Sequence, residues 1–211
     1  MKTYNITDTV EFNVYSGSLG ICVSGGADSA LMLYFALKYA TFTTHIFSLA
    51  NQEKWLRNTH ASIDVISKCA ELTDNYNFVH HVTYDVTQTK DNLFVLPTQY
   101  LAKDIVSTVY TGVTKNPPFE VTSTFTLESL ENSERDPTVV RPIKNGNWYR
   151  PWTNLDKQDL CDIYQQHNLI DTLFPVTRSC EWLNHDWPDL GIVHCGKCWW
   201  CEERQWGFGR L

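Results

Sequence analysis

The feature of this sequence that most constrains its fold is a short apolar segment that runs into a glycine-rich turn and then directly into a helical pattern. Residues 19–23 are Leu-Gly-Ile-Cys-Val, a run that predicts a buried strand. From Asp28 to Ala40, apolar residues recur at helical spacing, which predicts a helix. A buried strand joined to a helix by a tight turn is the first half of a βαβ unit, so the sequence favours an α/β fold.

The rest of the chain continues this alternation. Helices are expected at 53–73 and, weakened by Pro97, ahead of the last strand. A later helix is expected at 157–167, with Asp156 as its N-cap and Asp159 in its first turn. The further expected strands are 43–49, 78–86 and 107–113. Because βαβ crossovers are right-handed, we expect a Rossmann-like, mainly parallel sheet with helices on both faces.

The chain divides into three segments by pattern. Residues 1–18 are expected to form an N-terminal extension, residues 19–176 the α/β domain that the alternation describes, and residues 177–211 a tail packed on it. The tail is rich in Trp and Cys and has no clear periodicity. The extension contains alternating apolar residues, as an added edge strand would. These are Val10, Phe12 and Val14.

Composition and charge narrow the classes of partner. The 211 residues are 43% hydrophobic and 19% charged, which is typical of a globular protein with a substantial core. Seventeen Lys and Arg against 24 Asp and Glu give a net charge of −7, without a basic cluster. This disfavours nucleic acid as a partner and favours a small-molecule substrate. No apolar run is long enough to span a membrane and no secretory signal is evident, so we expect a cytoplasmic protein without a membrane partner.

The glycine-rich turn has the composition of a phosphate-binding loop. Its six residues are Ser24, Gly25, Gly26, Ala27, Asp28 and Ser29. The two glycines allow a ligand to approach the backbone closely, and the first N–H groups of the helix would point at the same place. The serine hydroxyls would add hydrogen-bond donors. The alternative is an ordinary tight turn in which Asp28 and Ser29 cap the helix.

Four of the seven cysteines lie in the tail at the spacing of a metal site. They are Cys180, Cys195, Cys198 and Cys201. Overlapping C-x2-C pairs suit thiolates around a tetrahedral ion better than they suit disulfides. Because four thiolates leave no open position on Zn²⁺, we expect a structural zinc, with an iron–sulfur cluster as the rival. The nearby His185 and His194 are expected not to be ligands.

The hexapeptide resembles the Ser-Gly-Gly-x-Asp-Ser signature of the PP-loop ATP pyrophosphatase superfamily, whose members use ATP to adenylate an oxygen atom of a substrate. The resemblance implies that residues 19–176 are a PP-loop ATP-binding domain, with the loop around the ATP phosphates and Asp28 near a Mg²⁺ ion. The segment from Pro151 to Lys157 is similar to a second motif of the superfamily and implies that Lys157 also binds ATP; a solvated first-turn lysine is the alternative. The implied ATP-binding residues are Val23, Ser24, Gly25, Gly26, Ala27, Asp28, Ser29 and Lys157.

The tail resembles the zinc segment of the 7-cyano-7-deazaguanine synthase family, which has the pattern Cys-Gly-x-Cys-x-x-Cys-x-x-Arg followed by Gly-Phe. This chain has that pattern from Cys195 to Phe208. The resemblance implies a divergent member of the family, an ATP-dependent carbon–nitrogen ligase that converts 7-carboxy-7-deazaguanine and ammonia to 7-cyano-7-deazaguanine for queuosine biosynthesis. It also implies a homodimer. It identifies no catalytic side chain.

Two segments depart from the family pattern where the acceptor substrate would be bound. Residues 49–52 replace a Tyr-Gly-Gln segment, and residues 115–119 replace a Gly-Tyr-Pro-Asp-Cys-like segment. Residues 115–147 are too long for a simple connection, and we expect them to close over the acceptor site. Two rivals remain: a PP-loop tRNA-thiolating enzyme with an iron–sulfur cluster, and a zinc-stapled nucleotide-binding protein without turnover.

Overall fold

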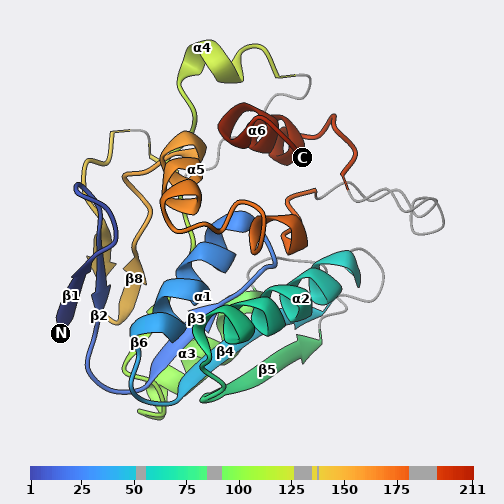
Figure 1. Ribbon diagram of the computed structural model, residues 1–211. Helices are drawn as coiled ribbons and strands as arrows, with labels where there is room; N and C mark the ends of the chain where they lie inside the picture. The colour runs from blue at the N-terminus through green and yellow to red at the C-terminus, as the bar shows by residue number, and fades with distance from the viewer. Residues whose placement is uncertain (51–55, 85–91, 126–134, 137, 181–193) are drawn as a thin grey trace.

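The computed structural model describes residues 1–50, 56–84, 92–125, 135–136, 138–180 and 194–211 (Figure 1). In these parts of the chain, a main sheet has six strands in the order β5-β4-β3-β6-β8-β7. All neighbours are parallel except β7 and β8, so the predicted α/β fold with a mainly parallel sheet is confirmed. The strands are β3 (Leu19–Cys22), β4 (Thr44–Ala50), β5 (Phe78–Tyr84), β6 (Thr108–Tyr110), β7 (Ile143–Asn145) and β8 (Trp148–Arg150).

Helices cover both faces of the sheet, as expected. Helices α1 (Ala27–Tyr39) and α2 (Leu56–Thr73) pack against each other on one face. Helix α3 (Asn92–Ala102) packs against β3, β4, β5 and β6 from the other face, and it contains Pro97. Helix α1 is buried along almost its whole length because it is apolar on all sides. None of the helices in the described residues combines the length and the apolarity needed to cross a membrane.

The second half of the chain adds shorter elements beyond the sheet. These are α4 (Phe119–Thr122), α5 (Lys157–Gln166), a 3₁₀ turn (Phe174–Val176) and α6 (Trp199–Phe208). The prediction for α5 is confirmed in detail: the Asp156 side chain accepts from two backbone N–H groups, and Asp159 completes a capping box. Elements α4 and β7 lie within residues 115–147, the segment that was expected to be too long for a simple connection.

The N-terminal extension is where the prediction of an added edge strand was wrong. Strands β1 (Lys2–Asn5) and β2 (Glu11–Val14) pair with each other in a separate two-stranded antiparallel sheet. The alternation correctly predicted a strand with one buried face, since Phe12 and Val14 are buried and belong to the same core as α1. Figure 1 shows this hairpin beside β8. A hairpin satisfies its inner backbone groups locally, and its apolar face then covers the core without joining the main sheet.

Candidate functional site

The glycine-rich loop lies at the carboxyl end of β3, where the order of the strands reverses. From β3 the chain passes to β4 and β5 on one side and later returns to β6 on the other side. Open α/β sheets bind ligands outside the carboxyl ends of their strands at such a reversal. Just past β6, Gly112 contacts the first turn of α1 so closely that a Cβ would lie 2.9 Å from the Ser29 nitrogen. The loop therefore stands where folds of this kind place ligand sites.

The loop is held in shape by its own hydroxyls and by its neighbours. Gly25 has a φ of +85°, and a Cβ there would lie 2.7 Å from Ala61 in α2, so both the turn and the packing require glycine. Its carbonyl accepts a hydrogen bond from the Arg178 N–H at 2.8 Å. The Ser24 N–H donates to Ser29 Oγ at 3.2 Å, and the two hydroxyl oxygens are 3.2 Å apart. Ser29 is buried, whereas Ser24 is exposed and can meet a ligand.

Helix α1 begins without a side-chain cap. Its N-cap residue is Gly26, and among the described residues no side-chain cap hydrogen bond is formed at this end. The alternative in which Asp28 and Ser29 cap this helix is therefore wrong. Because the first N–H groups have no side-chain cap in the described part of the chain, this end of α1 suits an anion such as phosphate.

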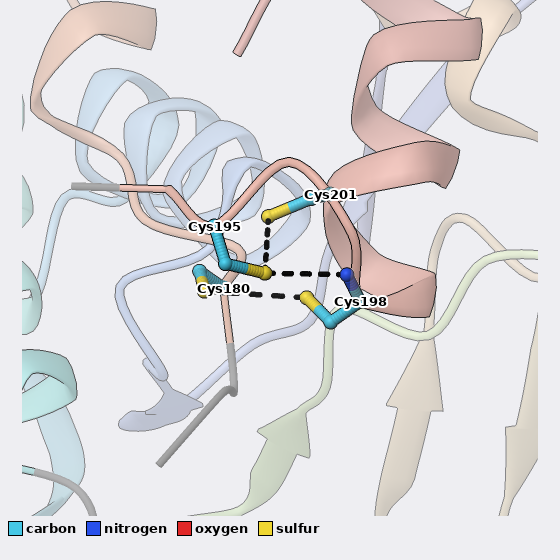
Figure 2. A group of neighbouring side chains, drawn as sticks. All are labelled: Cys180, Cys195, Cys198 and Cys201. Carbon is cyan, nitrogen blue, oxygen red and sulfur yellow. Dashed lines mark hydrogen bonds between the residues drawn. The ribbon is translucent and has the colours of Figure 1, made fainter. Parts of the chain in front are cut away.

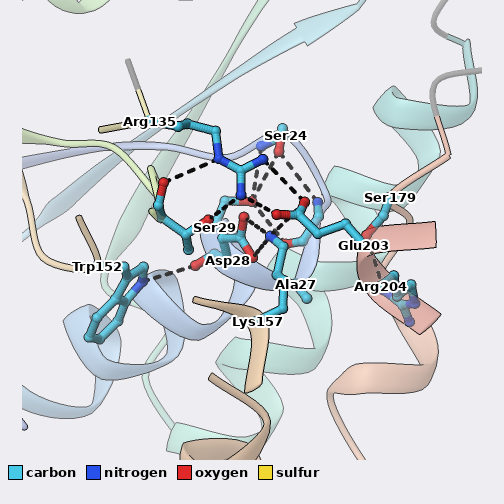
Figure 3. A network of polar contacts seen from close by, with 12 residues as sticks. Ser24, Ala27, Asp28, Ser29, Arg135, Trp152, Lys157, Ser179, Glu203 and Arg204 are labelled. Carbon is cyan, nitrogen blue, oxygen red and sulfur yellow. Dashed lines mark hydrogen bonds and ion pairs between the residues drawn. The ribbon is translucent and has the colours of Figure 1, made fainter. Parts of the chain in front are cut away.

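Four charged side chains form a continuous series of ion pairs at the loop (Figure 3). The Lys157 ammonium forms an ion pair with both carboxylate oxygens of Asp28 and lies 3.9 Å from Glu203. Glu203 in turn pairs with Arg135, whose guanidinium also donates to Thr114 Oγ1 at 3.1 Å. Lys157 is 7% exposed and Glu203 is 1% exposed, whereas Asp28 is partly open to solvent. Two cations thus balance two anions, with Asp28 at the exposed end.

The packing of α5 explains why Lys157 reaches the loop. Lys157 is the first residue of α5, and Gly207 of α6 lies so close that a Cβ would come within 2.1 Å of the Lys157 Cβ. Tyr164 and Trp152 donate to backbone carbonyls of the first turn of α1, at 2.8 and 3.2 Å. These contacts fix α5 against α1 and aim Lys157 at Asp28. The alternative of a solvated lysine is wrong.

The four predicted ligand cysteines form one cluster (Figure 2). Their sulfur atoms lie within 4.8 Å of one another; Cys195 and Cys201 are 3.8 Å apart, and Cys180 and Cys198 are 4.0 Å apart. Four thiolates at about 2.3 Å from a tetrahedral Zn²⁺ are separated by about 3.8 Å, so the cluster fits the ion. The backbone N–H of Cys198 donates to Cys195 Sγ at 3.2 Å, which favours a thiolate there.

The protonation state of the cluster depends on whether a cation is bound. Hydrogen bonds to the sulfurs of Cys180 and Cys198 raise the pKa of the Cys201 thiol well above its usual range. A divalent ion reverses this effect, because it stabilises each thiolate that it binds. His194 contributes no ligand atom to the cluster, and burial lowers its pKa to about 4. The prediction for His185 lies outside the described residues.

Helix α6 connects the cysteine cluster to the loop. Cys198 is its N-cap residue and Cys201 lies in its first turn. Two residues after Cys201, Glu203 joins the ion pairs of Lys157. The next residue, Arg204, is 2% exposed, stacks at 3.7 Å on the ring of Phe174, and has its pKa lowered to about 10 by burial. A metal that fixes the start of α6 therefore also fixes Glu203, which lies beside Lys157 at the loop.

The charge network is the part of the site that the sequence did not predict. Arg135 and Glu203 stand 68 positions apart, and Arg135 lies in a segment without periodicity. Single charged residues are common on surfaces, so only the fold reveals that these two are buried and paired. The sequence feature that could have pointed to a role for Glu203 was its position inside the cysteine pattern of the tail.

No protein-family model and no curated protein matches this chain. The site is therefore assigned from its residues and their geometry.

Proposed function

We propose that this protein is an ATP-dependent ligase of the PP-loop kind, which converts 7-carboxy-7-deazaguanine and ammonia to 7-cyano-7-deazaguanine. The observation that carries the proposal is the uncapped start of α1 at the reversal of the strand order, with the Asp28–Lys157 pair beside it. The cysteine cluster, joined to that pair through α6, adds to it, because the resemblance combines the same two features.

The chemistry explains why such an enzyme needs ATP. A carboxylate is a poor electrophile, because its oxygen is a poor leaving group. Its attack on the α-phosphorus of ATP releases pyrophosphate and gives an acyl adenylate; ammonia then displaces AMP and gives the amide. A second ATP adenylates the amide oxygen with release of pyrophosphate, and loss of AMP and a proton leaves the nitrile. Each adenylation needs the phosphates held and their charge neutralised, which is what a phosphate-binding loop provides.

The residues of the loop fit these roles. In this proposal the free N–H groups at the start of α1 and the exposed Ser24 hydroxyl bind the phosphates of ATP. Lys157 supplies the positive charge, and the partly exposed carboxylate of Asp28 would hold Mg²⁺ together with phosphate oxygens. When bound, Mg²⁺ neutralises phosphate charge.

The cysteine cluster has a structural role in this proposal. Four cysteines fill the coordination of Zn²⁺ and leave no position for water or substrate. The zinc orders residues 194–211 and the start of α6, and through Glu203 it sets the position of Lys157. An iron–sulfur cluster on the same thiolates would give a brown protein with visible absorption, whereas the zinc protein is colourless.

The test is to incubate the purified protein with ATP, Mg²⁺, ammonia and 7-carboxy-7-deazaguanine and to follow the base by mass spectrometry. We expect the nitrile to appear, with two AMP formed for each nitrile. An amide that accumulates would limit the activity to the first adenylation. An unchanged base, from protein that binds ATP and stoichiometric zinc, would refute the acceptor and favour a nucleotide-binding protein without turnover.

A further inference from the structure

Strand β5 is an open edge of the main sheet, and it lacks the features that normally protect such an edge. Among the described residues β5 pairs only with β4, so no strand lies along its other side (Figure 1). Natural sheets protect open edges with short strands, charged side chains, proline or bulges. Strand β5 has seven residues, and residues 75–84 contain no Asp, Glu, Lys, Arg or Pro. An edge of this kind is a template for pairing with another strand.

The opposite edge of the same sheet has the usual protection. Strand β7 has three residues, and one of them is the exposed Lys144. On β5 or just before it, by contrast, three large apolar side chains are exposed: Tyr76, Val79 and Tyr84. The two edges thus differ in length, in charge and in apolar exposure. The difference indicates that β5 is covered by a partner, whereas β7 faces solvent.

The hydrogen bonds to β4 determine which backbone groups of β5 a partner strand would meet. The Thr44 N–H donates to the Asn77 carbonyl at 3.1 Å, so this carbonyl faces β4. Successive residues of a strand direct their backbone groups to alternate sides, so every second residue from Asn77 onward bonds to β4. The residues between them direct their N–H and C=O groups away from the sheet. In the second half of the strand these are His80, Val82 and Tyr84.

A second copy of β5 matches this edge over its whole length. Two copies that run antiparallel about a two-fold axis at His81 overlap over all seven residues. Phe78 then lies opposite Tyr84 of the second copy, and Val79 lies opposite Thr83. Aromatic pairs and pairs of β-branched residues are favourable across antiparallel strands. In this register the outward N–H and C=O groups of the two copies also meet, so the strand is complementary to itself.

Charge also favours a second copy as the occupant. Each chain has a net charge of −7, so two copies repel each other at long range. Residues 75–84 are an exception, because they contain no acidic residue and no Lys or Arg. Helix α3, which packs against β5, has no charged residue either. A charged partner strand would find no ion pair at this edge, whereas a copy of β5 brings no charge to it.

We propose that two copies of this chain associate through their β5 strands, antiparallel about a two-fold axis at His81, so that their main sheets join into one. The homodimer expected from the resemblance has no assigned surface, and the edge supplies a surface and a register. The inference does not depend on the proposed function, because no residue of β5 belongs to the glycine-rich loop or to its ion pairs.

Cross-linking of the full-length chain tests the register. His81→Cys places two thiols across the axis in a non-hydrogen-bonded pair, where Cα atoms about 4.5 Å apart allow a disulfide. We expect oxidation to give a covalent dimer on a non-reducing gel. Thr83→Cys, on the same strand and the same face, lies opposite Val79 and is expected not to cross-link. The original chain, with its seven cysteines, gives the background.

Sedimentation equilibrium of the zinc-loaded full-length chain measures the association itself. Tyr84 is 74% exposed, so Tyr84→Lys is expected to leave folding and zinc content unchanged. We expect it to raise the dissociation constant of the dimer at least tenfold, because lysine at an edge opposes strand pairing. Asn145→Lys makes the same change of charge at an exposed position of β7, and the dimer is expected to keep its dissociation constant.

Three results would overturn the inference. A chain that is monomeric at all concentrations would leave the edge to a strand from a different protein. A dimer that Tyr84→Lys does not weaken would use another surface. Cross-linking of Thr83→Cys in place of His81→Cys would contradict the two-fold axis at His81. None of these results bears on formation of the nitrile, so the proposed function is tested separately.

Discussion

Lys157 is the single side chain on which the proposed ATP site depends most. It is buried, it neutralises Asp28, and it is held by the contact of Gly207 with the start of α5. Lys157→Met would leave a net negative charge beside the phosphates and an uncompensated carboxylate in the network. We expect ATP affinity to fall at least tenfold and stability to fall by about 1–3 kcal/mol, measured by calorimetry and by denaturant unfolding.

Lys115→Met is the matched control for that substitution. Lys115 pairs with Asp156 and Asp159 at 3.4 and 3.5 Å, at the start of α5, and these ion pairs do not include Asp28 or Glu203. Its side chain is partly exposed, and exposed ion pairs contribute only about 0–1 kcal/mol. Equal ATP affinity in the two variants would contradict the role given to Lys157.

Among the elements, α6 is predicted to transmit metal binding to the loop. Cys201→Ser removes one of four ligands, so the first turn of α6 should lose its anchor and Glu203 its fixed position. We expect loss of stoichiometric zinc, faster amide hydrogen exchange in α6 and several-fold weaker ATP binding. The control is Cys161→Ser, a cysteine in α5 outside the cluster. ATP affinity that survives loss of the metal would show that the cluster and the loop are uncoupled.

The pair of strands β4 and β5 is predicted to make stability depend on pH. Burial lowers the pKa of His45, His80 and His81, and the His45 and His81 rings stack with a ring-nitrogen contact of 3.0 Å. Below the unfolded pKa of about 6.5, the unfolded chain therefore binds more protons than the folded chain. The stabilisation present above that pH is lost as the pH falls, and the unfolding temperature should drop by a few degrees between pH 7.5 and 5.5.

The histidine prediction is checked with His81→Gln, which should flatten the dependence of the unfolding temperature on pH. His60→Gln, at an exposed position in α2, should keep the full dependence. Parallel curves for both variants would mean that the pH dependence arises elsewhere in the molecule.

Across the whole molecule, the sequence predicted the elements that carry a long regular pattern. Helix α1 and strands β3, β4 and β5 were predicted within a few residues, as far as the described residues extend, because apolar spacing sets burial directly. Strands β7 and β8 have three residues each, which is too few for alternation to be visible. The pairing of β2 with β1 rather than with the main sheet depends on tertiary packing, which no local pattern encodes.

The candidate site also has parts that the sequence predicted and parts that it did not. The loop and the cysteines are contiguous motifs, and the sequence predicted both the clustering of the cysteines and the position of the loop between β3 and α1. The ion pairs of Lys157 bring together residues far apart in the chain. Such contacts follow from the topology of the sheet, so they could only be found in the structure.

The measurement that tests the central claim most directly follows the oxygen atoms of the acceptor. With both carboxylate oxygens of 7-carboxy-7-deazaguanine labelled with ¹⁸O, adenylation predicts that each of the two AMP molecules carries one heavy oxygen and that the pyrophosphate carries none. Mass spectrometry of the nucleotide and phosphate products reads this out. Heavy oxygen in inorganic phosphate alongside ADP, or unlabelled AMP, would contradict adenylation of the acceptor and with it the role proposed for the glycine-rich loop.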